Sequence, residues 1–281
     1  MPFVETSPPP GLHDVHQPPS SLDYFQSVWD RREYIAHVAR GELKSRHMNT
    51  VLGNLWHLLN PMLQMAIYFL VFGVLLGVDR GIDNFIAFLA IGIFIFGFTQ
   101  RSTTSGAGSI INNRGLLTTL SFPRAMLPVT STVTEALATV SPLAVMYAIA
   151  LLTGETPSVT WLLLPLLFVV QTVFNAGAAL IAARSANTVR DITQVLPLIF
   201  RLLFYASGIL FDPERYLSAN SKFEWVFVAN PLFCLISLAR WCILGGDFDG
   251  RLVGVLAVWT VVLSVGGFIF FRGGEATYGR E

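Results

Sequence analysis

The chain has 281 residues, of which 53% are hydrophobic and only 13% are charged, and 22 of them are phenylalanine. This composition is too apolar for the surface of a soluble protein and indicates a membrane protein that crosses the bilayer several times. The 18 basic and 18 acidic residues balance to a formal charge of zero, which gives no support for nucleic-acid binding.

The N-terminal part of the chain is polar. Residues 1–26 are rich in proline and contain no apolar run of the kind that a secretory signal peptide needs, so we predict a disordered cytoplasmic tail. Residues 27–55 alternate apolar and charged residues at helical spacing directly before a hydrophobic run. This pattern predicts an amphipathic helix in the cytoplasmic headgroup layer. The alternative is a solvated helix that packs on a partner.

Hydrophobic segments dominate residues 56–272. We predict an all-α membrane domain over this range, followed by a cytoplasmic tail at 273–281. Cys234 and Cys242 would lie ~12 Å apart along one helix, beyond the reach of a disulfide, so we expect two buried thiols. The six predicted transmembrane spans are 56–78, 85–109, 127–153, 161–183, 192–210 and 252–271.

The segment 213–245 does not have the pattern of a span. It begins polar, becomes apolar and is interrupted by Asn230 and Pro231, so that each apolar half is too short to cross. We predict two short re-entrant helices buried in protein, where broken helices at membrane depth are tolerated. A seventh crossing is the alternative.

Basic residues are distributed unevenly over the predicted loops. Twelve of the 18 lie on the side that holds the N-terminal segment, the loops after the second and fourth spans and the C-terminal tail, and five lie on the other side. Because Lys and Arg accumulate in cytoplasmic loops, we predict that both termini are cytoplasmic.

Residues 112–124, NNRGLLTTLSFPR, form an amphipathic insert between the second and third spans. A solvated connection would expose its leucines and phenylalanine together, whereas a helix seated in the groove of a partner buries them. Asn112 or Asn113 can cap such a helix, and the arginines can pair with acidic groups of the partner. The residues that we assign to this coupling helix are Asn113, Arg114, Leu116, Leu117, Leu120, Phe122 and Arg124.

The sequence contains no GxxxxGK[ST] phosphate loop, no HExxH motif and no cluster of cysteine or histidine residues. We therefore expect no bound nucleotide, no metal and no catalytic residue in this chain. A membrane glycosyltransferase or phosphatase would need clustered acidic or histidine residues at an interface, and the sequence has none.

Three stretches carry a family resemblance. They are SRHMNTVLGNLWHLLNPMLQMAIYFLVF, NNRGLLTTLSFPRAMLP, and FDPER followed by NPL and an arginine. Together they resemble ABC-2 permeases of the polysaccharide-export type, over nearly everything after residue 25. Among these permeases, the chain is similar to the actinobacterial ones that export the cell-wall galactan precursor.

The resemblance implies a permease that forms a homodimer in the plasma membrane and binds two copies of a separate ATPase, which holds ATP and Mg. It also implies export of a polysaccharide linked to a polyprenyl diphosphate, through a channel between the two protomers. Another lipid-linked glycan, teichoic acid, a lipid or a drug remain alternative cargoes. An ion-coupled transporter would need intramembrane carboxylates, for which Glu135 is the only clear candidate.

A path for a glycan needs aromatic platforms and small polar groups. Two pairs of aromatic residues four positions apart share a helix face; for any single phenylalanine, ordinary packing is the alternative. The residues that we assign to the path are Tyr68, Phe72, Phe88, Phe200, Phe204, Tyr205 and Arg201.

Charged residues near or within the spans have separate assignments. A charge in mid-span costs ~2.5–3.5 kcal/mol, so Arg201 should face the dimer interior, water or a carboxylate, for which we expect Glu135. A lipid diphosphate needs guanidinium groups near the cytoplasmic interface, and we assign Arg40, Arg46 and Arg101 to it. The general excess of cytoplasmic arginines is the alternative explanation.

Overall fold

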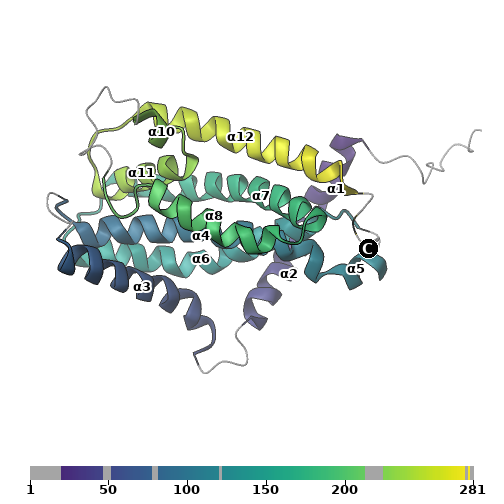
Figure 1. Ribbon diagram of the computed structural model, residues 1–281, viewed down its shortest axis with the longest axis horizontal. Coiled ribbons are helices and arrows are strands. Elements are labelled where there is room, and N and C mark those ends of the chain that lie inside the picture. Colours follow the sequence, from purple (N-terminus) through teal and green to yellow (C-terminus); the bar gives the residue numbers. More distant parts are fainter. Residues whose placement is uncertain are drawn as a thin grey trace, which may run out of the picture.

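The computed structural model describes residues 20–46, 52–77, 82–119, 122–212, 224–275 and 278. Every regular element in these ranges is helical, which confirms the predicted all-α fold. Most helices run along the long axis of the molecule, and short helices gather at its two ends (Figure 1). One end holds α1 (Ser21–Asp30), α2 (Arg32–Ser45) and α5 (Arg114–Thr119), and the other holds α10 (Glu224–Val228) and α11 (Pro231–Leu244).

Helix α4 (Phe85–Asn112) is the centre of the bundle. It packs against α3 (Trp56–Tyr68), α6 (Met126–Leu152) and α7 (Leu164–Thr188), and also against α11. Its first half is apolar on all sides, so this part of the helix has no face suited to water and is buried. The other helices are therefore arranged around α4.

Five helical segments within the described ranges are long and apolar enough to cross a membrane. They correspond to five of the six predicted spans. The first continues from α3 into the π-helical η2 (Phe69–Leu75), and the fourth begins with the 3-10 helix η3 (Val159–Leu163). The five segments are Leu58–Leu75, Phe85–Asn112, Met126–Leu152, Val159–Thr188 and Gly250–Arg272, the last of which is α12.

The span predicted over 192–210 is shorter than expected. Helix α8 (Ile192–Ala206) has 15 residues, or about 22 Å, which is less than the ~30 Å hydrocarbon core. The chain turns at Gly208, where φ is +62°, and the Arg240 guanidinium donates to the Gly208 carbonyl at 2.8 Å. A side chain from α11 thus binds backbone that would otherwise continue the helix.

The two short helices α10 and α11 meet at a break before Pro231. The Asn230 side chain caps α11 by accepting from the Leu232 amide at 3.0 Å. Asp212, just after α8, and Leu244, at the end of α11, line one cavity together with Asp83 and Glu155. Both ends of the segment therefore lie at the same end of the bundle, as a re-entrant pair requires and a crossing segment would not. Residues 213–223 lie outside the described ranges.

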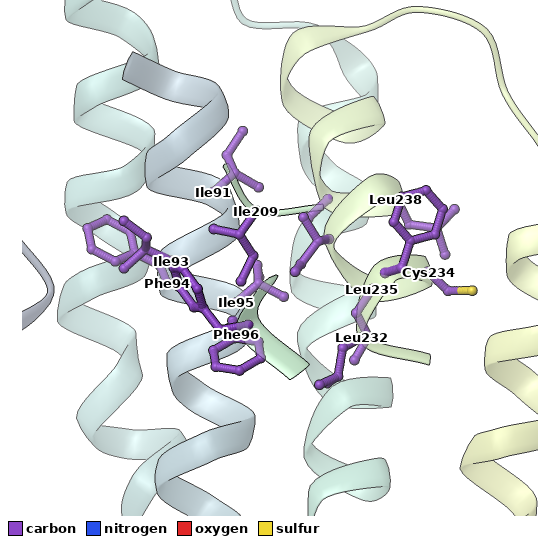
Figure 2. Packing of buried hydrophobic residues seen from close by; sticks show 14 of the residues in the cluster. Ile91, Ile93, Phe94, Ile95, Phe96, Ile209, Leu232, Cys234, Leu235 and Leu238 are labelled. Atoms are coloured by element: carbon purple, nitrogen blue, oxygen red, sulfur yellow. The ribbon is translucent and has the colours of Figure 1, made fainter. Parts of the chain in front are cut away.

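The core between α4 and α11 is apolar apart from Arg240, whose buried guanidinium donates to the Phe88 and Ile209 carbonyls. Figure 2 shows Ile209 between side chains of α4 and α11, with Ile91 and Ile95 on one side and Leu235 on the other. Both cysteines lie on α11 as free, buried thiols, in agreement with the sequence prediction. This packing fixes the re-entrant pair against the central helix.

Helix α12 crosses α7 at very close range. A Cβ atom added to Gly267 would lie 2.5 Å from the Gly177 carbonyl oxygen. Glycine is needed here because the two backbones approach too closely for any side chain. The contact fixes the last helix, and with it the C-terminal residues that follow.

The N-terminal predictions need correction. The helix expected over 27–55 is two helices, because the chain turns at Arg31 between α1 and α2. Residues 21–26, expected to be disordered, belong to α1, since Tyr24 is buried against the C-terminal end of the chain. The face of α2 that carries Ile35 and Ala39 packs on α6, so the chain itself covers it rather than lipid headgroups. Residues 1–19 and 47–51 lie outside the described part.

Candidate functional site

Helix α5 follows α4 after a single residue. The Asn113 side-chain amide donates to the Ser109 carbonyl at 2.8 Å and so bonds back to the end of α4. Its backbone carbonyl accepts from the amides of Leu116 and Leu117 at 3.0 and 3.2 Å. The side chain that we expected to cap the insert helix thus closes the preceding helix instead, and Asn112 is exposed.

The two neighbouring leucines of α5 face different surroundings. Leu116 is 46% exposed, whereas Leu117 is 8% exposed. Leu117 belongs to a buried cluster with Tyr24, Phe271 and Tyr278, against which Phe122 packs half-buried. This differs from the expectation that both leucines face a partner, because the termini of the chain already cover Leu117. Leu120 lies outside the described residues, and Arg114 is half-buried.

The turn between α5 and α6 is held by residues from both ends of the chain. The Tyr24 hydroxyl donates to Glu275 Oε1 at 2.7 Å and accepts from the Ala125 amide at 3.1 Å. The Arg124 amide donates to Glu275 Oε1 at 3.1 Å, and its guanidinium donates to the Glu275 carbonyl. Arg124, expected to pair with acidic groups of a partner, is therefore engaged within the chain.

Sequence reasoning missed Tyr24 and Glu275 because both lie in segments interpreted as tails. The signal that could have found the N-terminal one is the group of aromatic residues at 24, 25 and 29 in an otherwise polar stretch. No comparable signal marks Glu275.

A cavity of about 1130 Å³ with both apolar and polar lining residues opens beside α5, between α2, α4 and α6. Leu116 and Arg46 line it, together with neutral side chains that both donate and accept hydrogen bonds. Such a lining suits a hydroxylated or anionic group. The neutral hydroxyl and amide residues are Tyr34, Ser45, Ser105, Ser109, Asn112, Asn113, Thr130 and Ser131.

Glu135 lies next to this cavity and binds two of the predicted diphosphate residues. Its side chain is 2% exposed, and Oε1 accepts from the Arg46 guanidinium and from the Ser105 hydroxyl, the latter at 2.8 Å. Arg101 Nε lies 3.6 Å from Oε2. The expected pairing of Glu135 with Arg201 is therefore wrong, because Arg46 and Arg101 occupy this carboxylate.

The positive charges of Arg46 and Arg101 are balanced by the carboxylates of Glu42 and Glu135. Arg46 also pairs with Glu42 at 3.0 Å, so two guanidinium groups face two carboxylates. Burial lowers the pKa of Arg46, but the adjacent Glu135 and Glu42 carboxylates outweigh burial and raise it above its usual value. Arg46 stays charged, and an incoming anion would compete with Glu135 for it. Arg40 is exposed and does not line the cavity.

Several of the predicted path residues form one aromatic cluster. The Tyr68 ring lies 5.1 Å from that of Phe204 and 6.2 Å from that of Phe72. Phe204 also contacts Tyr205, at 5.6 Å. Phe200 and Phe204 are buried, and both contact Phe96 of α4. Most of these rings pack within the chain, and Tyr205 is the exposed one.

Two predicted path residues lie apart from this cluster. Phe88 makes no ring contact with these residues in the described part of the chain, and the Arg240 guanidinium carbon of α11 lies 3.3 Å from its ring centroid. Arg201 is exposed on α8, among the exposed apolar residues Leu198 and Leu202. The structure therefore brings Tyr68, Phe72, Phe200, Phe204 and Tyr205 together, but not Phe88.

The sequence profile described as ABC-2 type transporter matches residues 34–244. The O-antigen export system permease protein RfbA of Klebsiella pneumoniae is 28% identical over 84% of this chain and 89% of its own length. The protein of the same name from Myxococcus xanthus is 28% identical over 75% of this chain and 80% of its own. The polysialic acid transport protein KpsM of Escherichia coli is 25% identical, over 82% and 89%.

Proposed function

The chain belongs to the ABC-2 type transporter family, and on this basis we propose that it is the permease subunit of an ATP-driven polysaccharide exporter in the plasma membrane. The observation that carries the proposal is its similarity, over most of its length, to proteins named for O-antigen export and polysialic acid transport. We propose further that the cargo is a polymer on a polyprenyl diphosphate, and that it is galactan-like.

ATP hydrolysis is assigned to a separate subunit, of which the complex contains two copies. The sequence has no phosphate loop of its own. Leu116 offers an exposed apolar contact on α5, at the edge of the cavity that it lines. The proposal places α5 and both termini in the cytoplasm, and the gathering of α1, α5 and Glu275 at one end of the bundle supports it.

The complex also contains a second copy of this chain. Arg201 lies on the exposed face of α8, and a guanidinium at bilayer depth needs water or a polar partner. A homodimer whose α8 faces line a shared, hydrated path meets this need. In this arrangement Arg201 and Tyr205 face the glycan, whereas the buried rings of Phe200 and Phe204 support them from behind.

The diphosphate group is assigned to Arg46 and Arg101. Arg46 lines the cavity and Arg101 lies beside its neighbour Glu135, and both guanidinium groups can bind phosphate oxygens. An ion-coupled mechanism is less favoured, because its only clear carboxylate, Glu135, already binds these two arginines.

Depletion of the protein in its native host tests the cargo. We expect a lipid-linked polymer to accumulate on the cytoplasmic side, with a sugar composition that identifies it as galactan or as another glycan. Absence of any lipid-linked polymer would overturn the polysaccharide proposal.

Copurification tests the coupling assignment. Leu116→Asp should abolish copurification of an ATPase while the permease still inserts and folds. Leu22→Asp is the matched control, because Leu22 is also exposed at the same end of the bundle but lies on α1. An unchanged amount of ATPase with Leu116→Asp would refute the contact.

A further inference from the structure

We propose that the two ends of the chain form a brace that positions the coupling helix. The brace consists of Tyr24 and Glu275, and it holds Arg124 and Ala125 at the turn between α5 and α6. A displacement of α5 then displaces α6 as well, because the turn between them cannot bend freely. This inference rests on the proposed function, because it assumes that an ATPase acts at α5.

The bonds of the brace meet at the start of α6. The N-cap residue of this helix is Ala125, which has no side chain that could cap it. Its amide instead donates to the Tyr24 hydroxyl at 3.1 Å, and the preceding amide, of Arg124, donates to Glu275 Oε1 at 3.1 Å. Groups more than 100 residues away in sequence thus bind the backbone where α6 begins.

The Tyr24 hydroxyl links the two partners. It accepts from Ala125 and donates to Glu275 at 2.7 Å. Burial raises the pKa of Tyr24, so the hydroxyl stays protonated and remains a donor throughout the physiological range. Loss of this one oxygen would break both bonds at once.

Packing ties the brace to the coupling helix itself. The buried Leu117 of α5 shares a cluster with Tyr24, Phe271 and Tyr278. The Tyr278 hydroxyl donates to the Phe271 carbonyl at 2.7 Å, which holds Tyr278 against α12. A helix of six residues is not stable on its own, so α5 depends on these contacts for its position.

The two residues of the brace are attached to helices that are themselves packed tightly. Glu275 follows directly after α12, which is fixed to α7 by the close approach at Gly267. Tyr24 lies on α1, and the centroid of its ring lies 5.8 Å from that of Phe268 on α12. The turn before α6 is therefore bound to the end of α12. A displacement of α5 must then also move α6 and α12.

The test uses the full chain with Tyr24→Phe, which keeps the ring and removes only the hydroxyl. The control is Tyr147→Phe, since the Tyr147 hydroxyl also donates to a backbone carbonyl, that of Trp161 at 2.9 Å, but at the other end of the bundle. Glu275→Ala is a second variant, which removes the other half of the brace.

Two quantities are measured. In the permease without ATPase, amide hydrogen exchange over residues 122–127 should rise about five- to tenfold in Tyr24→Phe, as expected for the loss of a buried hydrogen bond. In the complex, the ATPase should still copurify, while the polymer exported per ATP hydrolysed falls several-fold. Glu275→Ala should give both changes, and Tyr147→Phe neither.

Unchanged exchange at 122–127 in both brace variants would overturn the brace. Faster exchange with unchanged export per ATP would overturn its role in coupling. Failure of the wild-type chain to bind any ATPase is a distinct result, because it would overturn the proposed function itself.

Discussion

Replacement of Glu135 by glutamine should loosen the attachment of α2 to α4 and α6. At 3.6 Å, the attraction between Arg101 and Glu135 is about 4–5 kcal/mol at an effective dielectric constant of about 20, before desolvation. Breaking a buried ion pair costs ~3–5 kcal/mol. This figure must be reduced here, because the Arg46 and Arg101 side chains are 24% and 34% exposed and glutamine still accepts hydrogen bonds. We therefore expect a loss of ~2 kcal/mol.

Thermal unfolding of the purified protein in detergent measures this loss. For a domain of this size, ~2 kcal/mol corresponds to a decrease in Tm of about 4–8 °C. Glu155→Gln is the matched control, since Glu155 accepts a hydrogen bond from the neutral amide of Asn84 at 2.8 Å rather than from an arginine. Its Tm should decrease by much less.

A double-mutant cycle with Arg46→Gln tests the reasoning directly. If the ion pair holds α2, the two single losses should overlap, with a coupling energy of ~1 kcal/mol or more. Additive losses, with a coupling energy below ~0.5 kcal/mol, would refute it. The double variant also separates the ion pair of Arg46 from its proposed binding of the lipid diphosphate. If Arg46 binds the diphosphate, the double variant should be more stable than the sum of the two single losses implies, but export should remain impaired.

Three further predictions concern packing. Gly267→Ala should lower stability by ~1–3 kcal/mol through overpacking, while Gly254→Ala on the same helix, where an added Cβ meets open space, should be harmless; fluorescence-detected size exclusion after heating compares them. Leu117→Ala should destabilise the isolated permease by ~2–5 kcal/mol, whereas Leu116→Ala should leave its Tm within about 2 °C and weaken ATPase binding instead; equal effects of the two on both measurements would contradict the assignment. Arg240→Gln should expose the two buried cysteines to maleimide, because the carbonyls that this side chain binds lose their partner; unchanged labelling would show that Arg240 does not hold the re-entrant pair.

Local pattern was enough to predict the membrane class and most of the helices. A run such as Phe85–Phe98 is apolar on every side, so only burial in a bundle or in lipid satisfies it. The break at Asn230 and Pro231 was also readable, because proline lacks the donor that a helix interior needs. The predicted boundaries of α4, α6 and α12 agree with the structure to within a few residues.

The candidate site was only partly predictable. The amphipathic pattern of 112–124 indicated a coupling helix, but periodicity could not show that one leucine is already covered by the termini of the chain. Likewise, the sequence led us to pair Glu135 with Arg201, because periodicity could not show that Arg46 and Arg101 lie next to this carboxylate.

The sequence alone therefore determined that this protein is a helical membrane permease with an amphipathic insert between its second and third spans. Only the tertiary structure decided where α8 ends, which arginines share Glu135, and that Tyr24 and Glu275 meet at the insert. The physical reason is the range of the interactions. Hydrophobic periodicity acts over one or two helical turns, whereas these bonds join residues between 32 and 251 positions apart.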